Sequence, residues 1–261
     1  MSEFWRSDLL PHLESRRSCQ VATCYRPHTH DRFSVGLIDS GSARLTGVPD
    51  EAVTLDAGDV IIIPAGHVHA CNPDRGRWQY QMIHADEGWI ASLAANAATQ
   101  VMRGISVYRD DAVYDRFNDL NTRLFANQEI SRVEADFADA LRECARRAPV
   151  HRLAPVNDPL LAARLAPVLE HLQGQASGSV LEELAELAGM SRYELIRATR
   201  RATGLTPIAW RQDQRIVTAR RMLREGRSLA DTAAVLGFTD QSHFHRVFRA
   251  HVAATPGAYR G

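Results

Sequence analysis

The chain has 261 residues, of which 45% are hydrophobic and 24% charged, and its formal net charge at pH 7 is zero. This length exceeds a typical single domain, so we expect two domains, each large enough to bury its own core. No apolar run approaches the roughly 18 residues of a membrane span and the charged N-terminus lacks the pattern of a secretory signal, so we expect a cytoplasmic protein without a membrane partner.

The zero net charge conceals an uneven distribution along the chain. Residues 1–157 hold 17 Arg against 21 Asp and Glu, a balance of −4, whereas residues 192–261 hold 13 Arg against 5 Asp and Glu, a balance of +8. A basic segment that follows a mildly acidic one indicates that only the C-terminal part binds a polyanion. The four cysteines include no CxxC pair, which favours reduced thiols over a disulfide framework.

The N-terminal region has the pattern of an all-β domain. From Gln20 to about Tyr108, short apolar runs such as FSVGLID, SARLTG, DVIIIP and WQYQMIH are separated by Gly, Pro, Asp and Asn. Short strands with frequent turn signals predict an antiparallel sandwich or barrel, which we assign to residues 1–109.

Two motifs within this region contain histidines, PHTH and GDVIIIPAGHVH. Both resemble the two motifs of cupins, which are small double-stranded β-barrels. The resemblance implies a cupin-like barrel in which His28, His30 and His69 occupy positions that ligate a metal in metal-binding cupins. Ser34 stands where those proteins carry a glutamate, so the hard carboxylate ligand is missing.

Three interpretations of these histidines remain open. They line a pocket for a small organic effector, they hold a divalent transition metal such as Zn²⁺ or Ni²⁺, or they are hydrogen-bonded residues of an ordinary barrel. The predicted effector-binding residues are His28, His30, Ser34, His69, Trp78 and Tyr80. The predicted metal ligands are His28, His30 and His69.

Residues 110–147 show helical periodicity in two segments, DDAVYDRFNDLNTRLFANQ and SRVEADFADALRECARR. Val113, Phe117, Leu120 and Leu124 fall on one stripe of the first segment. This stripe either packs against the barrel or pairs two copies of the chain in a homodimer. Residues 148–159 contain three prolines, which is typical of a stiff linker between domains.

The C-terminal region contains an internal repeat. The segment from Ser179 to Arg211 aligns without gaps, at an offset of 49, onto the segment from Ser228 to Arg260. In each copy a serine precedes an acidic residue by three positions, as with Ser179 and Glu182, which is the spacing of a reciprocal helix cap. The sequence therefore predicts that one structural unit occurs twice.

Each copy reads as a helix, a tight turn and a second helix. Gly189 and Gly237 fall at the turns, where a positive φ is often required, and Ser191 and Asp240 are suited to cap the second helices. A Thr-Pro pair after each second helix is typical of the cap and first residue of the next helix.

The second helix of each copy has an apolar and a polar face. Leu195 with Thr199, and Phe244 with Phe248, recur at a spacing of four and are expected to point inward. Outward guanidinium, amide and hydroxyl groups suit contacts with phosphates and base edges. The predicted DNA-binding residues are Arg192, Tyr193, Ile196, Arg197, Arg200, Gln241, Ser242, His245, Arg246 and Arg249.

The segment between the two copies predicts one helix over about 207–225, with Ile216, Ala219 and Leu223 at helical spacing. At about 1.5 Å per residue this helix is about 27 Å long. A rigid spacer of this size can hold two recognition helices about one DNA turn apart, which is about 34 Å.

The run GFTDQSHFHRVFRAHVAATPGAYR resembles the signature of the AraC family of transcription regulators, and GMSRYELIRATRRATGLTP is similar to that family's first helix-turn-helix. The resemblance implies seven helices and an AraC-type DNA-binding domain over residues 160–261. Two positions depart from the family pattern: Ala253 stands where glycine is usual, and Thr199 where a bulky apolar residue is common.

The expected fold is therefore α+β with two domains, a cupin-like antiparallel barrel with following helices and an all-α domain with two helix-turn-helix units. The expected function is a transcription activator that binds specific double-stranded DNA, responds to a small-molecule or metal effector and contacts RNA polymerase. One alternative is a metal-dependent cupin enzyme with a DNA-binding tail, against which Ser34 argues. The other is an effector-independent regulator with a dimerising barrel.

Overall fold

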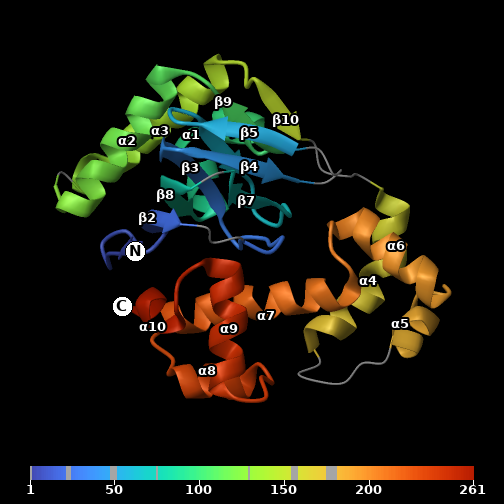
Figure 1. Ribbon diagram of the computed structural model, residues 1–261. Coiled ribbons are helices and arrows are strands. Elements are labelled where there is room, and N and C mark those ends of the chain that lie inside the picture. Colours follow the sequence, from blue (N-terminus) through green and yellow to red (C-terminus); the bar gives the residue numbers. More distant parts are fainter. Residues whose placement is uncertain are drawn as a thin grey trace. The chain divides into compact units, whose positions relative to one another are not determined.

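A computed structural model describes residues 2–21, 25–47, 52–74, 76–128, 130–153, 158–174 and 181–261 (Figure 1). The chain divides into two compact units. Residues 1–24 and 30–155 form the first, which we call the β unit. Residues 25–29 and 156–261 form the second, which we call the helical unit, so a short N-terminal stretch belongs to the C-terminal unit.

The β unit contains two antiparallel sheets. Seven strands follow the order β1-β2-β8-β3-β6-β9-β10, and three follow the order β5-β4-β7. The strands are β1 (Ser2–Trp5), β2 (Leu13–Val21), β3 (Phe33–Ser40), β4 (Ser42–Thr46), β5 (Ala52–Asp56), β6 (Val60–Ile63), β7 (Ala70–Pro73), β8 (Arg77–Ala85), β9 (Ile105–Tyr108) and β10 (His151–Leu153). The predicted antiparallel sheet structure is confirmed, and β1 and most of β2 lie before Gln20, where the strand pattern was expected to begin.

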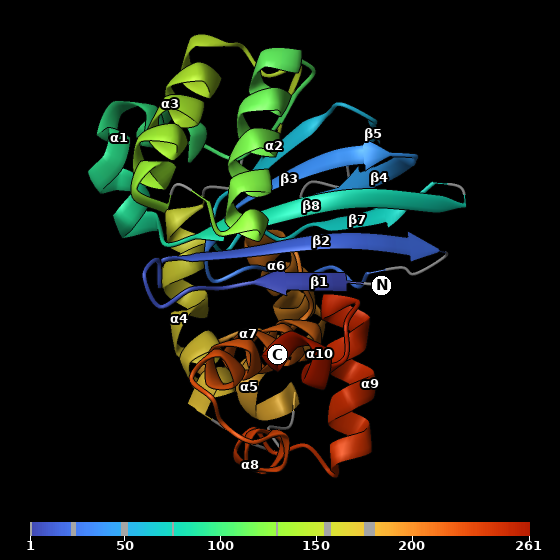
Figure 2. The same cartoon turned by 90° about the vertical axis from the view of Figure 1, so that its left-hand side faces the viewer.

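Three helices cover one face of the seven-stranded sheet (Figure 2). They are α1 (Glu87–Val101), α2 (Asp111–Ala126) and α3 (Val133–Arg146), and a short 3₁₀ turn, η1 (Ile130–Arg132), precedes α3. The predicted stripe of α2 is confirmed, because Val113, Phe117, Leu120 and Leu124 are at most 1% exposed and belong to the core beneath the helices. Helix α1 lies within the region that was expected to contain strands alone.

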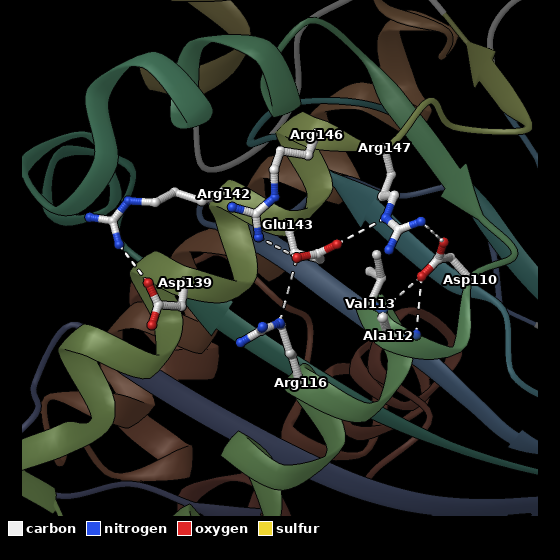
Figure 3. A network of polar contacts seen from close by, with 9 residues as sticks. All are labelled: Asp110, Ala112, Val113, Arg116, Asp139, Arg142, Glu143, Arg146 and Arg147. Carbon is white, nitrogen blue, oxygen red and sulfur yellow. Dashed lines mark hydrogen bonds and ion pairs between the residues drawn. The ribbon is translucent and has the colours of Figure 1, made fainter.

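A network of ion pairs joins α2 to α3 (Figure 3). At its centre is Glu143, which accepts a hydrogen bond from Arg146 and another from Nε of Arg147 at 2.9 Å. Nε of Arg116 on α2 lies 3.8 Å from the same carboxylate. The hydrogen bonds from Arg146 and Arg147 lower the pKa of Glu143 to about 2. Arg147 also pairs with Asp110, the residue that caps α2.

The segment predicted as a linker begins as part of the sheet. His151–Leu153 form β10, which pairs with β9 through His151 and Val107. A three-residue edge strand can pair in this way because its backbone supplies the hydrogen bonds whatever its side chains are. The linker expected over residues 148–159 is therefore shorter on its N-terminal side, and residues 154–157 lie outside the described part of the chain.

The described residues of the helical unit form seven helices, as predicted from the family resemblance. These are α4 (Pro159–Gly174), α5 (Leu181–Leu187), α6 (Arg192–Thr203), α7 (Pro207–Arg224), α8 (Leu229–Val235), α9 (Gln241–Val252) and α10 (Pro256–Arg260). Figure 1 shows α7 running from the group of α5 and α6 to the group of α8 and α9. None of the helices in the described ranges is long and apolar enough to cross a membrane.

The predicted helix caps are present. Ser191 and Glu194 form a reciprocal cap at the start of α6, and Asp240 accepts a hydrogen bond from the backbone of His243 in α9. Gly189 and Gly237 have φ values of 60° and 67°, so each supplies the left-handed turn that precedes a second helix. Ser179, which was predicted to cap the first helix, lies outside the described residues.

Candidate DNA interface and effector site

The recognition helices of the two repeats are α6 and α9, and each buries one face. Leu195 and Thr199 in α6, and Phe244 and Phe248 in α9, are fully buried as predicted. Thr199 fits this face because its hydroxyl donates to the carbonyl of Leu195 at 2.8 Å. The packing of one helix face leaves the opposite face of each recognition helix to solvent.

Most predicted DNA-binding residues lie on these outward faces. Ile196 and His245 differ because they are half-buried, and Nε2 of His245 is buried without a hydrogen-bond partner among the described residues. Arg192 forms an exposed ion pair with Glu182 at 2.5 Å. The exposed members are Arg192, Tyr193, Arg197, Arg200, Gln241, Ser242, Arg246 and Arg249.

Helix α7 connects the two helix-turn-helix units as one continuous helix of 18 residues. Thr206 caps it, and Pro207 occupies its first turn as the Thr-Pro pair predicted. Ile216, Ala219 and Leu223 are buried, which confirms the expected stripe. The helix therefore has the length and the packing of the rigid spacer expected between the two recognition helices.

The second candidate site is the sheet face that does not carry the helices. Core residues such as Val35 and Ile83 point to the helices, so their neighbours in the strands point to the opposite face. In the register of β2 with β8 and of β8 with β3, buried polar and aromatic residues lie directly opposite each other. We call this surface the polar face; it is formed by Glu14, Arg16, Ser18, Gln20, Ser34, Trp78, Tyr80, Met82 and His84.

Arg16 places a positive charge on the polar face although it is only 6% exposed. Its guanidinium lies 5.4 Å from the ring centroids of both Phe4 and Tyr80. Its Nε donates to Oγ of Ser18 at 2.5 Å, and Nη2 donates to Oγ of Ser2 at 3.1 Å. A buried guanidinium between two rings suits a ligand with an anionic or electron-rich polar group.

Trp78 and Tyr80 lie side by side on the same face, with ring centroids 4.3 Å apart in a stacked arrangement. Trp78 is 2% exposed, and its Nε1 is buried without an acceptor among the described residues. Buried donors in native proteins are normally paired, so this donor, which has no acceptor within the described ranges, is a candidate contact for a bound ligand.

Ser34 connects two histidines at one end of the polar face. Its Oγ lies 2.7 Å from Nδ1 of His30 and 2.8 Å from Nδ1 of His84, and it donates to the carbonyl of Arg32 at 3.1 Å. Ser34 has one proton, so at least one of these two Nδ1 atoms donates to it. The His30 ring also meets the edges of His69 and His84, with centroids 4.7 Å apart in each pair.

The predicted metal ligands have a suitable donor arrangement. Nδ1 of His28 faces the carbonyl of Arg26 at 2.8 Å, and Nδ1 of His69 faces that of His67 at 3.0 Å. Carbonyls only accept, so Nδ1 is protonated and Nε2 carries the lone pair that ligates a metal. Only Thr29 separates His28 from His30 in the chain, and the three histidines offer ligand atoms within 4.8 Å of one another.

Comparison with known proteins identifies both units. Residues 11–143, about half of the chain, match the AraC-like ligand binding domain, and residues 184–261 match a helix-turn-helix domain. The chain belongs to the AraC family of transcription regulators. The expected DNA-binding function and the helix-turn-helix assignment are confirmed at this level.

Relatives along nearly the whole chain agree with this membership. An uncharacterized HTH-type transcriptional regulator, YbfI of Bacillus subtilis, is 26% identical over 239 residues, which cover 89% of this chain and 86% of the relative. The arabinose operon regulatory protein of Salmonella typhimurium is 25% identical over 78% of this chain and 74% of its own. Both are described as regulators, in agreement with the expectation that the chain is not an enzyme.

Among solved structures, ToxT from Vibrio cholerae shares the fold, with a TM-score of 0.55 and 12% identity, covering all of this chain and 96% of ToxT. This likeness confirms the α+β architecture of an antiparallel β domain followed by a helical domain. Within this AraC-family fold, the recognition helices and the polar face are the two surfaces that carry candidate function.

The polar residues of β2 were not predicted from the sequence. Glu14, Arg16, Ser18 and Gln20 alternate with a spacing of two, which is the signal of one strand face. The signal was hidden because Ser15 and Arg17 on the other face are also polar, so the strand shows no contrast between its faces. Both of these residues contact α2, through Asn121 and Thr122 respectively.

Proposed function

We propose that this AraC-family regulator reads its operator with the outward faces of α6 and α9, and that it activates transcription through contact with RNA polymerase. The observation that carries the proposal is the placement of Arg197 and Arg246, which occupy equivalent positions 49 residues apart and are both exposed. Each presents a guanidinium that suits the O6 and N7 atoms of guanine. Two such residues on a shared scaffold fit recognition of two successive segments of the major groove.

We propose further that a small-molecule effector binds at the polar face and shifts the regulator between states of different DNA affinity. The support comes from buried Arg16, from the unpaired donor of Trp78 and from the histidines around Ser34. These groups favour an effector that combines an electron-rich or anionic polar group with a planar or apolar body. The effector contacts predicted at His28, His30, Ser34, His69, Trp78 and Tyr80 stay part of this proposal, and Arg16 is added to them.

The descriptions of the similar proteins do not point to one effector class. One is the arabinose operon regulatory protein, and a ToxT structure is described as bound to an unsaturated fatty acid. The composition of the polar face is therefore the basis for choosing an effector class for this chain.

The first experiment tests DNA recognition. Wild-type protein is titrated against the DNA upstream of its own coding region in a band-shift assay, with Arg246→Ala and Arg197→Ala as variants. Each variant is expected to lose about 1–3 kcal/mol of specific binding because a base contact is removed. Arg227→Ala is the matched control, since Arg227 is exposed and lies outside the recognition helices. Unchanged affinity in both recognition-helix variants contradicts the proposal that Arg197 and Arg246 contact bases.

A divalent metal is the second candidate effector. A tetrahedral Zn²⁺ with bonds of about 2.0–2.1 Å to nitrogen sets its ligand atoms about 3.4 Å apart. His28, His30 and His69 offer ligand atoms within 4.8 Å of one another, so metal binding requires them to move closer together. Zn²⁺ or Ni²⁺ fits better than a hard cation, because Ser34 replaces the carboxylate of metal-binding cupins.

Metal binding is tested by metal analysis of the purified protein and by calorimetric titration with Zn²⁺. His69→Ala is expected to lower the affinity for Zn²⁺ at least tenfold, whereas His151→Ala serves as the control because His151 is exposed on β10. Equal affinity in the two variants excludes the three-histidine site.

We also propose that the regulator forms a homodimer. The apolar stripe of α2 is buried in the core of the β unit, so an exposed surface and not this stripe would form the interface. Sedimentation velocity tests this, and a monomer at micromolar concentration contradicts it. The effector-independent alternative predicts that no small molecule raises the melting temperature, whereas a true effector raises it by mass action.

A further inference from the structure

A short stretch between β2 and β3 is part of the helical unit. The backbone N–H of Thr29 donates to Oδ1 of Asp213 in α7 at 2.9 Å, and its hydroxyl donates to Oδ2 at 2.6 Å. The backbone N–H of Arg26 donates to the carbonyl of Ala250 in α9 at 3.1 Å. We call residues 25–29 the brace segment, because it joins the helix between the two helix-turn-helix units to the second recognition helix.

Asp213 is the anchor of this segment on α7. It is 1% exposed and lies three residues from Trp210 and three from Ile216, both of which are buried. Burial raises the pKa of Asp213 to about 6, an effect that hydrogen bonds from Thr29 and Gln214 oppose. A carboxylate among apolar residues is tolerated only where donors satisfy it. Thr29 supplies two of these donors from 184 positions away in the sequence.

The brace segment contacts the C-terminal end of α9, away from the first residues of the helix. Ala250 lies in the last turn of α9, whereas Gln241 and Ser242 begin the helix. In helix-turn-helix proteins the N-terminal residues of the recognition helix contact base edges. The segment therefore restrains α9 without covering its DNA-reading end, and such restraint reduces the ordering cost that binding would otherwise incur.

We propose that the brace segment positions α9 on α7 for DNA binding, and that Thr29 is the positioning residue that fixes the segment to α7. The chain continues from this stretch into β3 of the β unit. Thr29 lies between His28 and His30, and His30 contacts Ser34 on the polar face. An effector or metal bound at these residues therefore affects the adjoining brace segment. This second role rests on the function proposed above.

The test uses the full-length chain and a duplex selected by the wild-type protein from a random-sequence pool. Thr29→Val removes the hydroxyl donor and keeps the side-chain shape, and Thr29→Ser is the matched control that keeps the hydroxyl. In fluorescence anisotropy, Thr29→Val is expected to lower the affinity for the selected duplex at least fivefold and to leave the affinity for a scrambled duplex unchanged. Thr29→Ser is expected within twofold of wild type. Equal affinities of Thr29→Val and wild type for the selected duplex overturn the proposal.

Variants at Asp213 provide a second test that does not depend on the folding of Thr29→Val. Asp213→Asn keeps an oxygen that accepts from the Thr29 backbone and an amide that donates to its hydroxyl, so it is expected within twofold of wild type. Asp213→Leu removes both hydrogen bonds with Thr29, so its loss is expected to be at least as large as that of Thr29→Val. The double variant is expected to be no weaker than Asp213→Leu, because Thr29→Val removes one of the same two bonds. Additive losses in the double variant contradict the proposal.

Amide hydrogen exchange tests the connection between the units. By linkage, a segment that promotes DNA binding is itself stabilised by DNA, so the selected duplex is expected to slow exchange at the Thr29 amide in the wild type. Unchanged exchange at saturating duplex overturns this role. A wild-type chain without sequence preference contradicts the proposed function, whereas sequence preference that Thr29→Val retains contradicts the brace alone.

Discussion

Gly204 and Ala253 occupy equivalent positions in the two repeats, at the C-terminal ends of α6 and α9, and both adopt the left-handed conformation with φ values of 79° and 51°. Glycine adopts this conformation without strain, whereas the Cβ of alanine is held close to a backbone oxygen. Alanine in place of the usual glycine at position 253 therefore adds strain to the helix cap and leaves its geometry intact.

Ala253→Gly is expected to stabilise the helical unit. Relief of the left-handed strain contributes about 1–2 kcal/mol, and the greater freedom of glycine in the unfolded chain offsets part of it, so we expect a net gain of about 0.5–1 kcal/mol. Thermal and urea unfolding measure the change. Gly204→Ala is the reciprocal variant and is expected to lose a similar amount. A loss of stability in Ala253→Gly contradicts the strain argument.

Glu143→Gln tests the ion-pair network that joins α2 to α3. Arg146 and Arg147 hold the pKa of Glu143 near 2, below its ordinary value, so its stabilising contribution is present above about pH 4.5 and is lost as the pH falls toward 2. The variant is expected to be less stable than wild type at pH 7 and equally stable near pH 2. Chemical unfolding of the two proteins across this range measures the difference.

The matched control is Asp139→Asn, which removes an exposed i,i+3 pair with Arg142 on the same helix. Exposed pairs of this kind contribute little, so its stability is expected to stay within about 0.5 kcal/mol of wild type. A Glu143→Gln variant that equals wild type at pH 7 would show that the network does not stabilise the helix layer.

The raised pKa of Asp213 predicts a pH dependence of stability that is opposite in sign to that of Glu143. Its pKa is raised by burial from 3.8 to about 6, and hydrogen bonds from Thr29 and the charge of Arg220 act against this shift. The folded state therefore favours the protonated acid, and the associated stability is present below about pH 4 and is lost as the pH rises through about 6. Two pKa units correspond to about 2–3 kcal/mol at most.

Asp213→Asn has no proton to lose at this position, so its stability relative to wild type is expected to rise between pH 5 and pH 7. The difference between the two unfolding free energies at each pH cancels the titration of other groups. A relative stability of Asp213→Asn that stays constant across this interval shows that Asp213 is already ionised without penalty in the folded chain.

Features with local causes were predicted best from the sequence. The caps at Ser191 and Asp240 and the turns at Gly189 and Gly237 each depend on a few neighbouring residues, and the repeat shows each of them twice. The outward position of Arg246 follows from the same local periodicity, because the inward residues of α9 fix the other face.

Features that depend on tertiary contacts were not predicted. Arg16 lies on a strand whose two faces are both polar, so its burial becomes visible only when β1 and β8 are paired with it. The contact between Thr29 and Asp213 joins residues without any shared sequence pattern. One available signal was the position of Asp213 three residues before Ile216, in phase with the predicted apolar stripe of α7.

A substitution at Ser34 tests whether its hydrogen bonds to His30 and His84 stabilise the β unit. Ser34→Ala removes the hydroxyl that lies within hydrogen-bond distance of Nδ1 of both His30 and His84, so each buried ring loses this bond. An unsatisfied buried polar group costs about 1–3 kcal/mol, so the melting temperature of the β unit is expected to fall.

Ser34→Thr keeps the hydroxyl, but it adds a methyl group at a fully buried position. His84→Phe combined with Ser34→Ala is therefore the better control, because it removes one of the two ring nitrogens that lost the bond to Ser34 and should recover part of the loss. A double variant that is less stable than Ser34→Ala alone would place the stabilising role in the packing of His84 and not in its bond to Ser34.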